Sequence, residues 1–192
     1  MTKVAVVAYP LLGEADQRWI DSTRAQHDPQ ANLIGAHFTL VFPIDADSDA
    51  VAVHVRSVVS EAAPIPLVVK EVRAVPDHSG VGGHVFLVPD HGYPELVALH
   101  DRLYEGLLRD HWRRDIPYVP HMTVAAYPAF ARCVAVAQEL DAVRRVVLGR
   151  VKSVDVVHVR TETVQKVASF RLGHIVAEAA TGGGRPSRPT KS

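Results

Sequence analysis

Two histidines, each followed two positions later by a threonine, are the residues of this 192-residue chain that suggest chemistry. The motifs read His37-Phe38-Thr39-Leu40 and His121-Met122-Thr123-Val124. An imidazole has an unperturbed pKa of about 6.5, so it can accept or donate a proton near neutral pH. A threonine hydroxyl beside it can donate a hydrogen bond to an anionic oxygen. We predict acid–base chemistry on a phosphate, with His37 and His121 as acid and base and with Thr39 and Thr123 as phosphate ligands.

Both motifs lie in apolar segments that are typical of β-strands. Side chains on a strand alternate between its two faces, so His37 and Thr39 share one face and Phe38 and Leu40 share the other. The second motif alternates in the same way. The apolar faces belong against helices, which leaves both His/Thr pairs on the opposite faces. If two similar halves are related by an approximate two-fold axis, the pairs meet across a cleft.

The predicted elements around the motifs repeat along the chain. The first half contains strands at 4–9, 37–43 and 67–75, with helices at 14–27 and from 47 or 48 onward. The second half contains strands at 84–88, 121–127 and 151–159, a helix that begins at Pro94 and a helix at 129–140. The helix from Pro94 is expected to turn five leucines inward: Leu96, Leu99, Leu103, Leu107 and Leu108. A strand at 167–172 has no counterpart in the first half.

An offset of 84 residues superimposes the two halves. It separates His37 from His121, and it also carries the strand 67–75 onto 151–159. We interpret this agreement as an internal duplication, with one motif in the middle strand of each copy. A single His-x-Thr is common in ordinary sheets, but two in matching strands favour a shared site. We expect one bilobal domain over 1–175, with lobes of about 1–78 and 84–175.

Composition narrows the function classes. The 21 basic and 21 acidic residues balance, which argues against a cationic surface that grips duplex DNA. Cys133 is the single cysteine, so no intrachain disulfide can form and a cytoplasmic location is expected. No apolar run reaches the ~18 to 20 residues that span a bilayer. We expect a monomer whose tail, 181–192, is disordered because it has little to bury.

Other chemistries fit the sequence less well. His37 and His121 could be metal ligands, but no Asp, Glu or Cys lies at ligand spacing beside either motif. A Gly-x-Ser-x-Gly elbow is absent, and 80–83 is too loosely patterned for a phosphate-binding loop. We therefore expect no metal and no cofactor. The remaining histidines are interpreted as surface or loop residues: His27, His54, His78, His84, His91, His100, His111, His158 and His174. Three tyrosines near the motifs could stack a base, although packing is the default interpretation: Tyr9, Tyr118 and Tyr127.

The paired tetrads resemble the 2H phosphoesterase superfamily, and within it the bacterial 2'-5' RNA ligase-like branch that includes RNA 2',3'-cyclic phosphodiesterases. Pro120 before the second motif and Phe42-Pro43 at the end of the first add to the similarity, which covers about 1–175. The resemblance implies an α+β (mixed α/β) bilobal fold, with two mainly antiparallel sheets and outer helices around a central groove. It also implies that the histidines act as acid and base and that the threonines bind phosphate.

The expected substrates follow from the same resemblance. They are RNA ends with a 2',3'-cyclic phosphate, 2'-5' linked oligonucleotides, or small cyclic nucleotides such as ADP-ribose cyclic phosphate. Some relatives place a basic residue shortly after the second motif, where this chain has Ala125, Ala126 and Tyr127. Arg160 and Arg171 are candidate replacements. The leading prediction is a cyclic phosphodiesterase; reversible 2'-5' RNA ligation and a non-catalytic module that binds RNA ends or nucleotides are the alternatives.

Overall fold

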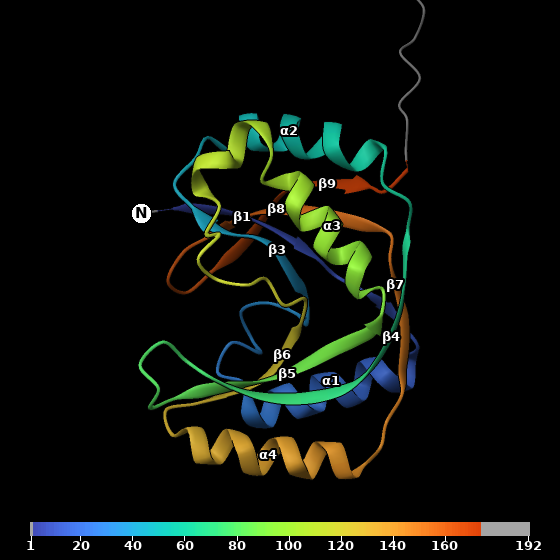
Figure 1. Ribbon diagram of the computed structural model, residues 1–192, viewed down its shortest axis with the longest axis vertical. Helices are drawn as coiled ribbons and strands as arrows, with labels where there is room; N and C mark the ends of the chain where they lie inside the picture. Colours follow the sequence, from blue (N-terminus) through green and yellow to red (C-terminus); the bar gives the residue numbers. More distant parts are fainter. Residues whose placement is uncertain (1, 174–192) are drawn as a thin grey trace, which may run out of the picture.

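The computed structural model describes residues 2–173, which form a mixed α+β fold (Figure 1). The strands are β1 (Lys3–Ala8), β2 (Leu11–Leu12), β3 (Phe38–Ile44), β4 (Ile65–Pro76), β5 (Gly83–His91), β6 (Met122–Tyr127), β7 (Val147–Val151), β8 (Ser153–Val159) and β9 (Val164–Arg171). The helices are α1 (Glu14–His27), α2 (Ser48–Ser60), α3 (Tyr93–Leu103), the 3-10 helix η1 (Gly106–His111) and α4 (Phe130–Ala142). The predicted tail 181–192 lies outside the described residues.

Two antiparallel sheets form the centre of the molecule. The four-stranded sheet has the order β3-β1-β8-β9, and the five-stranded sheet has the order β2-β7-β4-β5-β6. Helix α2 packs on the four-stranded sheet, and α1 and α4 pack on the five-stranded sheet, whereas α3 contacts β3 of the first sheet and β4 and β5 of the second (Figure 1). We call the face of the four-stranded sheet opposite α2, and the face of the five-stranded sheet opposite α1 and α4, the inner faces. The predicted fold class is confirmed.

The lobes are not the continuous segments 1–78 and 84–175 that the repeat suggested. A shift of 84 residues carries β1, β3 and β4 onto β5, β6 and β8, and both sheets contain the corresponding strand order. However, β4 pairs with β5, and β8 pairs with β1, so the copies exchange their third strands. β4 and β5 form a hairpin, whose turn is closed by a hydrogen bond of 3.1 Å from the Asp77 amide to the Gly82 carbonyl, whereas β8 reaches β1 from far along the chain.

The predicted strand 151–159 is two strands in different sheets. β7 pairs with β4, whereas β8 pairs with β1, and the chain crosses between the sheets at Lys152. Both segments are rich in valine, so composition does not reveal the crossing. The choice of partner depends on distant strands that bury each face.

The leucine helix of the second half is also shorter than expected. α3 begins with Pro94 in its first turn, as predicted, but it ends at Leu103. Gly106 has a φ of 57°, a conformation that glycine adopts readily, and it redirects the chain into η1. Leu108 is therefore buried, whereas Leu107 is exposed instead of turned inward.

The amino-terminal helices follow their sequence signals closely. α1 has the predicted bounds, and Asp47 caps α2 by accepting a hydrogen bond from the Ala50 amide at 2.8 Å. The main core contains apolar side chains from both sheets and includes the fully buried Cys133. Within residues 2–173, no helix combines the length and the apolar composition needed to cross a bilayer.

Candidate active site

The two motif histidines are held in the same way. The Nδ1 atom of His37 lies 2.8 Å from the carbonyl oxygen of Gly35, and that of His121 lies 2.6 Å from the carbonyl oxygen of Val119. A carbonyl oxygen can only accept, so each Nδ1 donates its proton. Each imidazole is thereby fixed in orientation, and its Nε2 remains for exchange of a proton with a ligand.

The two imidazoles belong to one electrostatic environment. The pKa of His121 is lowered to about 4, mainly by burial and to a smaller extent by positive charge on His37 and His84, whereas the hydrogen bond to Val119 raises it. Burial also lowers the pKa of His37 from its usual value of 6.5. Both rings are therefore neutral at pH 7 in the free protein, and each one disfavours a charge on the other. A bound phosphate, which carries negative charge, would raise both pKa values.

Both threonines lie on inner faces. Thr39 pairs with Val7 of β1, whose side chain belongs to a small separate cluster on that inner face. Thr123 pairs with Phe86 of β5, and both are partly exposed, whereas Met122 and Val124 on either side of Thr123 are buried in the main core. The alternation predicted from sequence is thus present in both strands. Neither threonine hydroxyl has a side-chain hydrogen bond among those within the described part of the chain.

Two tyrosines hold the free edge of β3. The Tyr118 hydroxyl donates to the carbonyl oxygen of Thr39 at 2.9 Å, and the Tyr104 hydroxyl accepts from the Phe42 amide at 3.0 Å. β3 is the terminal strand of its sheet, so these bonds replace pairing with a further strand. Tyr118 lies three residues before His121 in the chain. Its hydrogen bond to Thr39 therefore connects the segment that leads into the second motif with the first motif.

Replacing Tyr118 by phenylalanine is expected to lower kcat by on the order of 10-fold to 100-fold, because the two motifs can shift relative to each other once the hydrogen bond from Tyr118 to Thr39 is lost. The matched control is Tyr104→Phe, which removes one hydroxyl from the same aromatic cluster but frees Phe42 instead of Thr39. Thermal unfolding should show similar losses of stability for the two variants. Steady-state kinetics should show a much smaller loss of kcat for Tyr104→Phe than for Tyr118→Phe. Equal losses of kcat in both variants would contradict this role.

Aromatic side chains flank both histidines. Phe86 stacks on His121 with ring centroids 3.6 Å apart, and Tyr9 lies against His37 with ring centroids 6.0 Å apart. His84 lies on the other side of Phe86, with a centroid distance of 5.9 Å. Sequence reasoning missed Phe86 and His84. Their only signal was alternation in β5, which turns both away from the buried Val85.

The three tyrosines considered for base stacking have different positions. Tyr9 is beside His37 and remains available. Tyr118 already stacks on His100 at 3.7 Å, and Tyr127 bonds to the Nδ1 of His27 at 2.7 Å, which places it under α1. His100 is buried at 3% exposure and so is not the surface residue that the sequence suggested, because α3 turns it toward the aromatic cluster.

A buried ion pair supports the segment that leads to His37. Arg24 and Asp28, at the end of α1, are 2.8 Å apart with side-chain exposures of 4% and 3%. Asp28 also accepts from the Gln30 amide at 2.9 Å. After burial and the hydrogen bond to Gly35, these two charges are the next influences on the pKa of His37: Arg24 lowers it and Asp28 raises it.

Of the two arginines proposed as extra phosphate ligands, Arg160 is excluded by its position. It bonds to the Thr2 hydroxyl at 2.9 Å, near the start of β1, whereas His37 lies beside the other end of that strand. The strand between them has six residues, or about 20 Å at the usual rise. Arg171, on the outermost strand β9, pairs in register with Ser153 of β8, and β9 is at the opposite edge of the sheet from β3, which follows His37.

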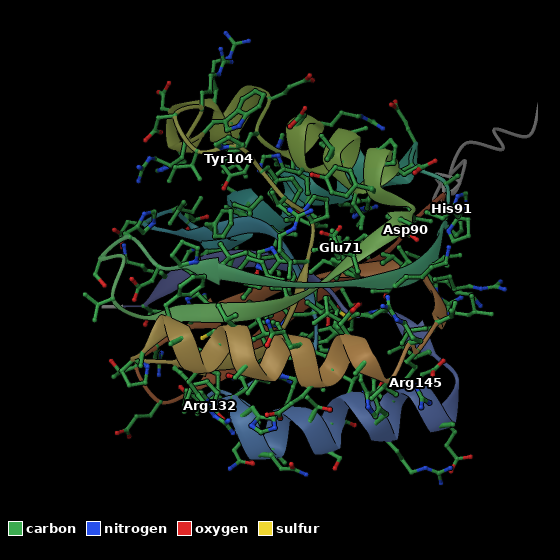
Figure 2. The ribbon with its side chains drawn as sticks, turned by 60° about the horizontal axis from the view of Figure 1, so that its bottom comes forward. Glu71, Asp90, His91, Tyr104, Arg132 and Arg145 are labelled. Atoms are coloured by element: carbon green, nitrogen blue, oxygen red, sulfur yellow. The ribbon has the colours of Figure 1, made fainter. Side chains whose placement is uncertain are left out.

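Two hollows lie away from the motif histidines. One, of about 160 Å³, lies between α1, α4 and strands β4, β5 and β7 of the five-stranded sheet and is lined in part by Trp19 and Arg145. The other, of about 260 Å³, lies between α3 and the segment 112–118. Arg132 and Arg145 mark the outer surface near α4 in Figure 2. In residues 2–173, no group of three or more His, Cys, Asp or Glu side chains is placed to hold a metal ion.

The chain is similar in sequence to proteins that are provisionally named phosphoesterases. A protein of Bacillus licheniformis, provisionally named a phosphoesterase, is 29% identical over 126 residues, which cover 64% of this chain and 70% of its own. A protein of Geobacillus kaustophilus with the same kind of name is 27% identical over 125 residues, or 64% and 68% of the two chains.

Solved structures share the fold. E. coli LigT complexed with 3'-AMP gives a TM-score of 0.59 at 16% identity, covering 90% of this chain and 99% of that chain. Usb1 of Kluyveromyces marxianus gives a TM-score of 0.54 at 9% identity, covering 88% and 98%. The profile of the 2'-5' RNA ligase superfamily matches residues 12–169. The chain therefore belongs to the 2'-5' RNA ligase superfamily, whose members have the 2H phosphoesterase fold.

Proposed function

We propose that this protein is a metal-independent phosphoesterase that hydrolyses 2',3'-cyclic phosphate RNA ends or related small cyclic nucleotides. The observation that carries the proposal is the matched pair of imidazoles, each with Nδ1 bound to a carbonyl two residues before it. Each therefore has Nε2 for one proton transfer, and their charges interact. Membership of the superfamily and the similarity to phosphoesterase-type relatives support the same chemistry.

The reaction needs one neutral and one protonated imidazole. We assign His121 as the base, because its pKa is lowered to about 4 and it stays neutral when the other ring is charged. It takes a proton from water, whose oxygen forms a bond to phosphorus. One ester oxygen of the cyclic phosphate leaves and receives the proton held by His37. The products are a phosphomonoester and a free hydroxyl group, and the two histidines have exchanged protonation states.

The threonines serve the phosphate and not the proton transfers. Thr39 and Thr123 lie on the inner faces next to their own histidines, so their hydroxyls can donate to the two non-bridging oxygens. Donors fixed by strands need no rearrangement as charge develops in the transition state. The similarity of fold to LigT, which has been crystallised with 3'-AMP, supports a nucleotide phosphate as the ligand.

The pH dependence should show both histidines. The active free form has His37 protonated and His121 neutral, so kcat/KM falls as pH rises through the pKa of His37 and as pH falls through that of His121. The pKa of His37 lies below 6.5 and that of His121 is about 4. We therefore expect a bell-shaped dependence of kcat/KM on pH, with its maximum between these two pKa values. The profile of kcat should lie at higher pH, since bound phosphate raises both values. A kcat/KM that keeps rising from pH 6.5 to 8 would refute the assignment.

The substrate class can be tested with 2',3'-cyclic mononucleotides, RNA with a cyclic end and ADP-ribose cyclic phosphate, each with and without a chelator. We expect turnover of at least one, unchanged by chelator. Turnover that requires an added divalent metal would overturn the mechanism. Binding of a nucleotide without any turnover would favour a binding module.

The family also supports a second activity, 2'-5' RNA ligation. The same two proton transfers serve ligation when a hydroxyl of one RNA, in place of water, attacks the cyclic phosphate of another: His121 takes the proton of that hydroxyl, and the ester oxygen that leaves receives the proton held by His37. Joining of oligoribonucleotides and hydrolysis of cyclic ends should be measured under identical conditions. Joining faster than hydrolysis at micromolar RNA would make ligation the principal activity.

A further inference from the structure

A cation lies on the same inner face as the second motif. β4 and β5 pair Arg73 with Phe86, and β5 and β6 pair Phe86 with Thr123. Directly paired side chains lie on the same face of a sheet, so Arg73, Phe86 and Thr123 form a row across three strands. Two strand spacings separate the backbones of Arg73 and Thr123 by about 10 Å, which an arginine side chain partly spans.

The guanidinium of Arg73 points along its strand toward the row of His121. Its Nε donates to Oε1 of Glu71 at 2.7 Å, and an Nη lies 2.7 Å from the same oxygen. Glu71 pairs with Val88, and the register that joins Leu87 to Met122 continues to Val88 beside His121. Figure 2 shows Glu71 on the side of the sheet that faces α3, opposite α4. The guanidinium therefore lies on the face of the sheet that carries the second motif, and the Arg73 side chain is 43% exposed.

The row of paired residues through Thr39 in the other sheet differs in its third residue. Thr39 pairs with Val7, and Val7 pairs with Asp155, so the third residue of that row is an acid. The Asp155 side chain is 5% exposed, and its carboxylate lies 2.9 Å from the Lys166 ammonium group. The duplicated fold thus places an exposed arginine beside one motif and a buried aspartate beside the other.

We propose that Arg73 binds a second phosphate of the substrate, so that the preferred substrate has a phosphate beyond the one that reacts. This inference rests on the proposed function and narrows it: an oligonucleotide end or a pyrophosphate-containing nucleotide is preferred to a cyclic mononucleotide. The reacting phosphate lies between His37 and His121, and the second lies over β4 and β5. Because Glu71 already neutralises part of the guanidinium charge, it opposes this second contact.

The test compares three substrates: a 2',3'-cyclic mononucleotide, a dinucleotide that ends in a 2',3'-cyclic phosphate, and ADP-ribose cyclic phosphate. Arg73→Gln should lower kcat/KM about 10-fold to 100-fold for at least one of the two substrates with additional phosphate, the usual size of a charged hydrogen bond. It should change kcat/KM less than about 2-fold for the mononucleotide. The two larger substrates distinguish a phosphodiester from a pyrophosphate. Glu71→Gln should act in the opposite direction on the same substrate.

Lys70→Gln is the matched control, because it removes one positive charge from the same strand. Lys70 pairs with Asp90 at 3.1 Å and lines the hollow beside Trp19, on the α1 and α4 side. It should leave all three substrates unchanged. Equal losses for the three substrates with Arg73→Gln, or no loss with any, would overturn the subsite.

A binding measurement separates this inference from the proposed function. If the wild-type protein turns over none of the substrates, the proposed function fails, and the subsite is then decided by calorimetry. Dinucleotide that ends in a 3'-phosphate should bind the wild-type protein at least about 10-fold more tightly than it binds Arg73→Gln, and the mononucleotide 3'-phosphate should bind both equally. Equal affinities of both proteins for the dinucleotide would refute the second phosphate contact.

Discussion

Replacing His121 by asparagine is expected to lower kcat by about 10²-fold to 10⁴-fold, the usual contribution of a positioned acid or base. Asparagine keeps an N–H that can reach the Val119 carbonyl, but it has no group that titrates. The local backbone should therefore be retained while the proton transfer is lost. His37→Asn, which can keep its bond to Gly35, should give a loss in the same range. Cleavage of a cyclic-ended substrate in single-turnover experiments measures both.

The double variant and one control make the result specific. Because both histidines act in one step, His37→Asn combined with His121→Asn should be little slower than either single variant. His54→Asn is the control, since the Nε2 of His54 also bonds to a backbone carbonyl, that of Leu103, at 2.9 Å. It should retain wild-type kcat. A loss below about 10-fold in either motif variant would contradict acid–base catalysis by that residue.

Replacing Arg24 by methionine should destabilise the fold by about 3–5 kcal/mol, because it leaves the Asp28 carboxylate buried without its partner. The side chains are 4% and 3% exposed, so water cannot compensate for the lost charge. The double variant Arg24→Met with Asp28→Asn should recover much of this loss, since no charge then remains in the interior and asparagine can still accept from the Gln30 amide. Denaturant unfolding measures the free energy of unfolding of each variant.

The same pair connects stability to the site. The segment after Asp28 leads directly to His37, and the charges of Arg24 and Asp28 act on that histidine in opposite directions. Loss of Arg24 should therefore also raise the pKa of His37 and move the alkaline limb of kcat/KM to higher pH. The surface pair of Arg18 and Glu14, whose side chains are 70% and 82% exposed, provides the comparison. Arg18→Met should lower the free energy of unfolding by less than about 1 kcal/mol. Equal costs for the two arginines would show that burial of Arg24 does not matter.

Sequence patterns that span a few residues were enough to predict which side chains share a strand face and where two of the helices lie. The alternation around His37 and His121 placed each histidine and its threonine on one face, because side chains on a strand repeat every two residues. The apolar spacing of 14–27 and the capping Asp47 defined α1 and α2 for the same kind of local reason. The repeat of 84 residues correctly paired the two motifs as equivalent parts of the fold.

Only the tertiary structure decided which strands meet. The exchange of β4 and β8 between the repeats, and the crossing at Lys152, depend on hydrogen bonds between segments far apart in the chain. The hydrogen bond from Tyr118 to Thr39 joins residues 79 positions apart. Arg73 lies in one row with Thr123 of the second motif only because three strands pair in register. A strand's periodicity fixes its faces but not its neighbours, since any strand with a matching apolar face can supply the same backbone hydrogen bonds.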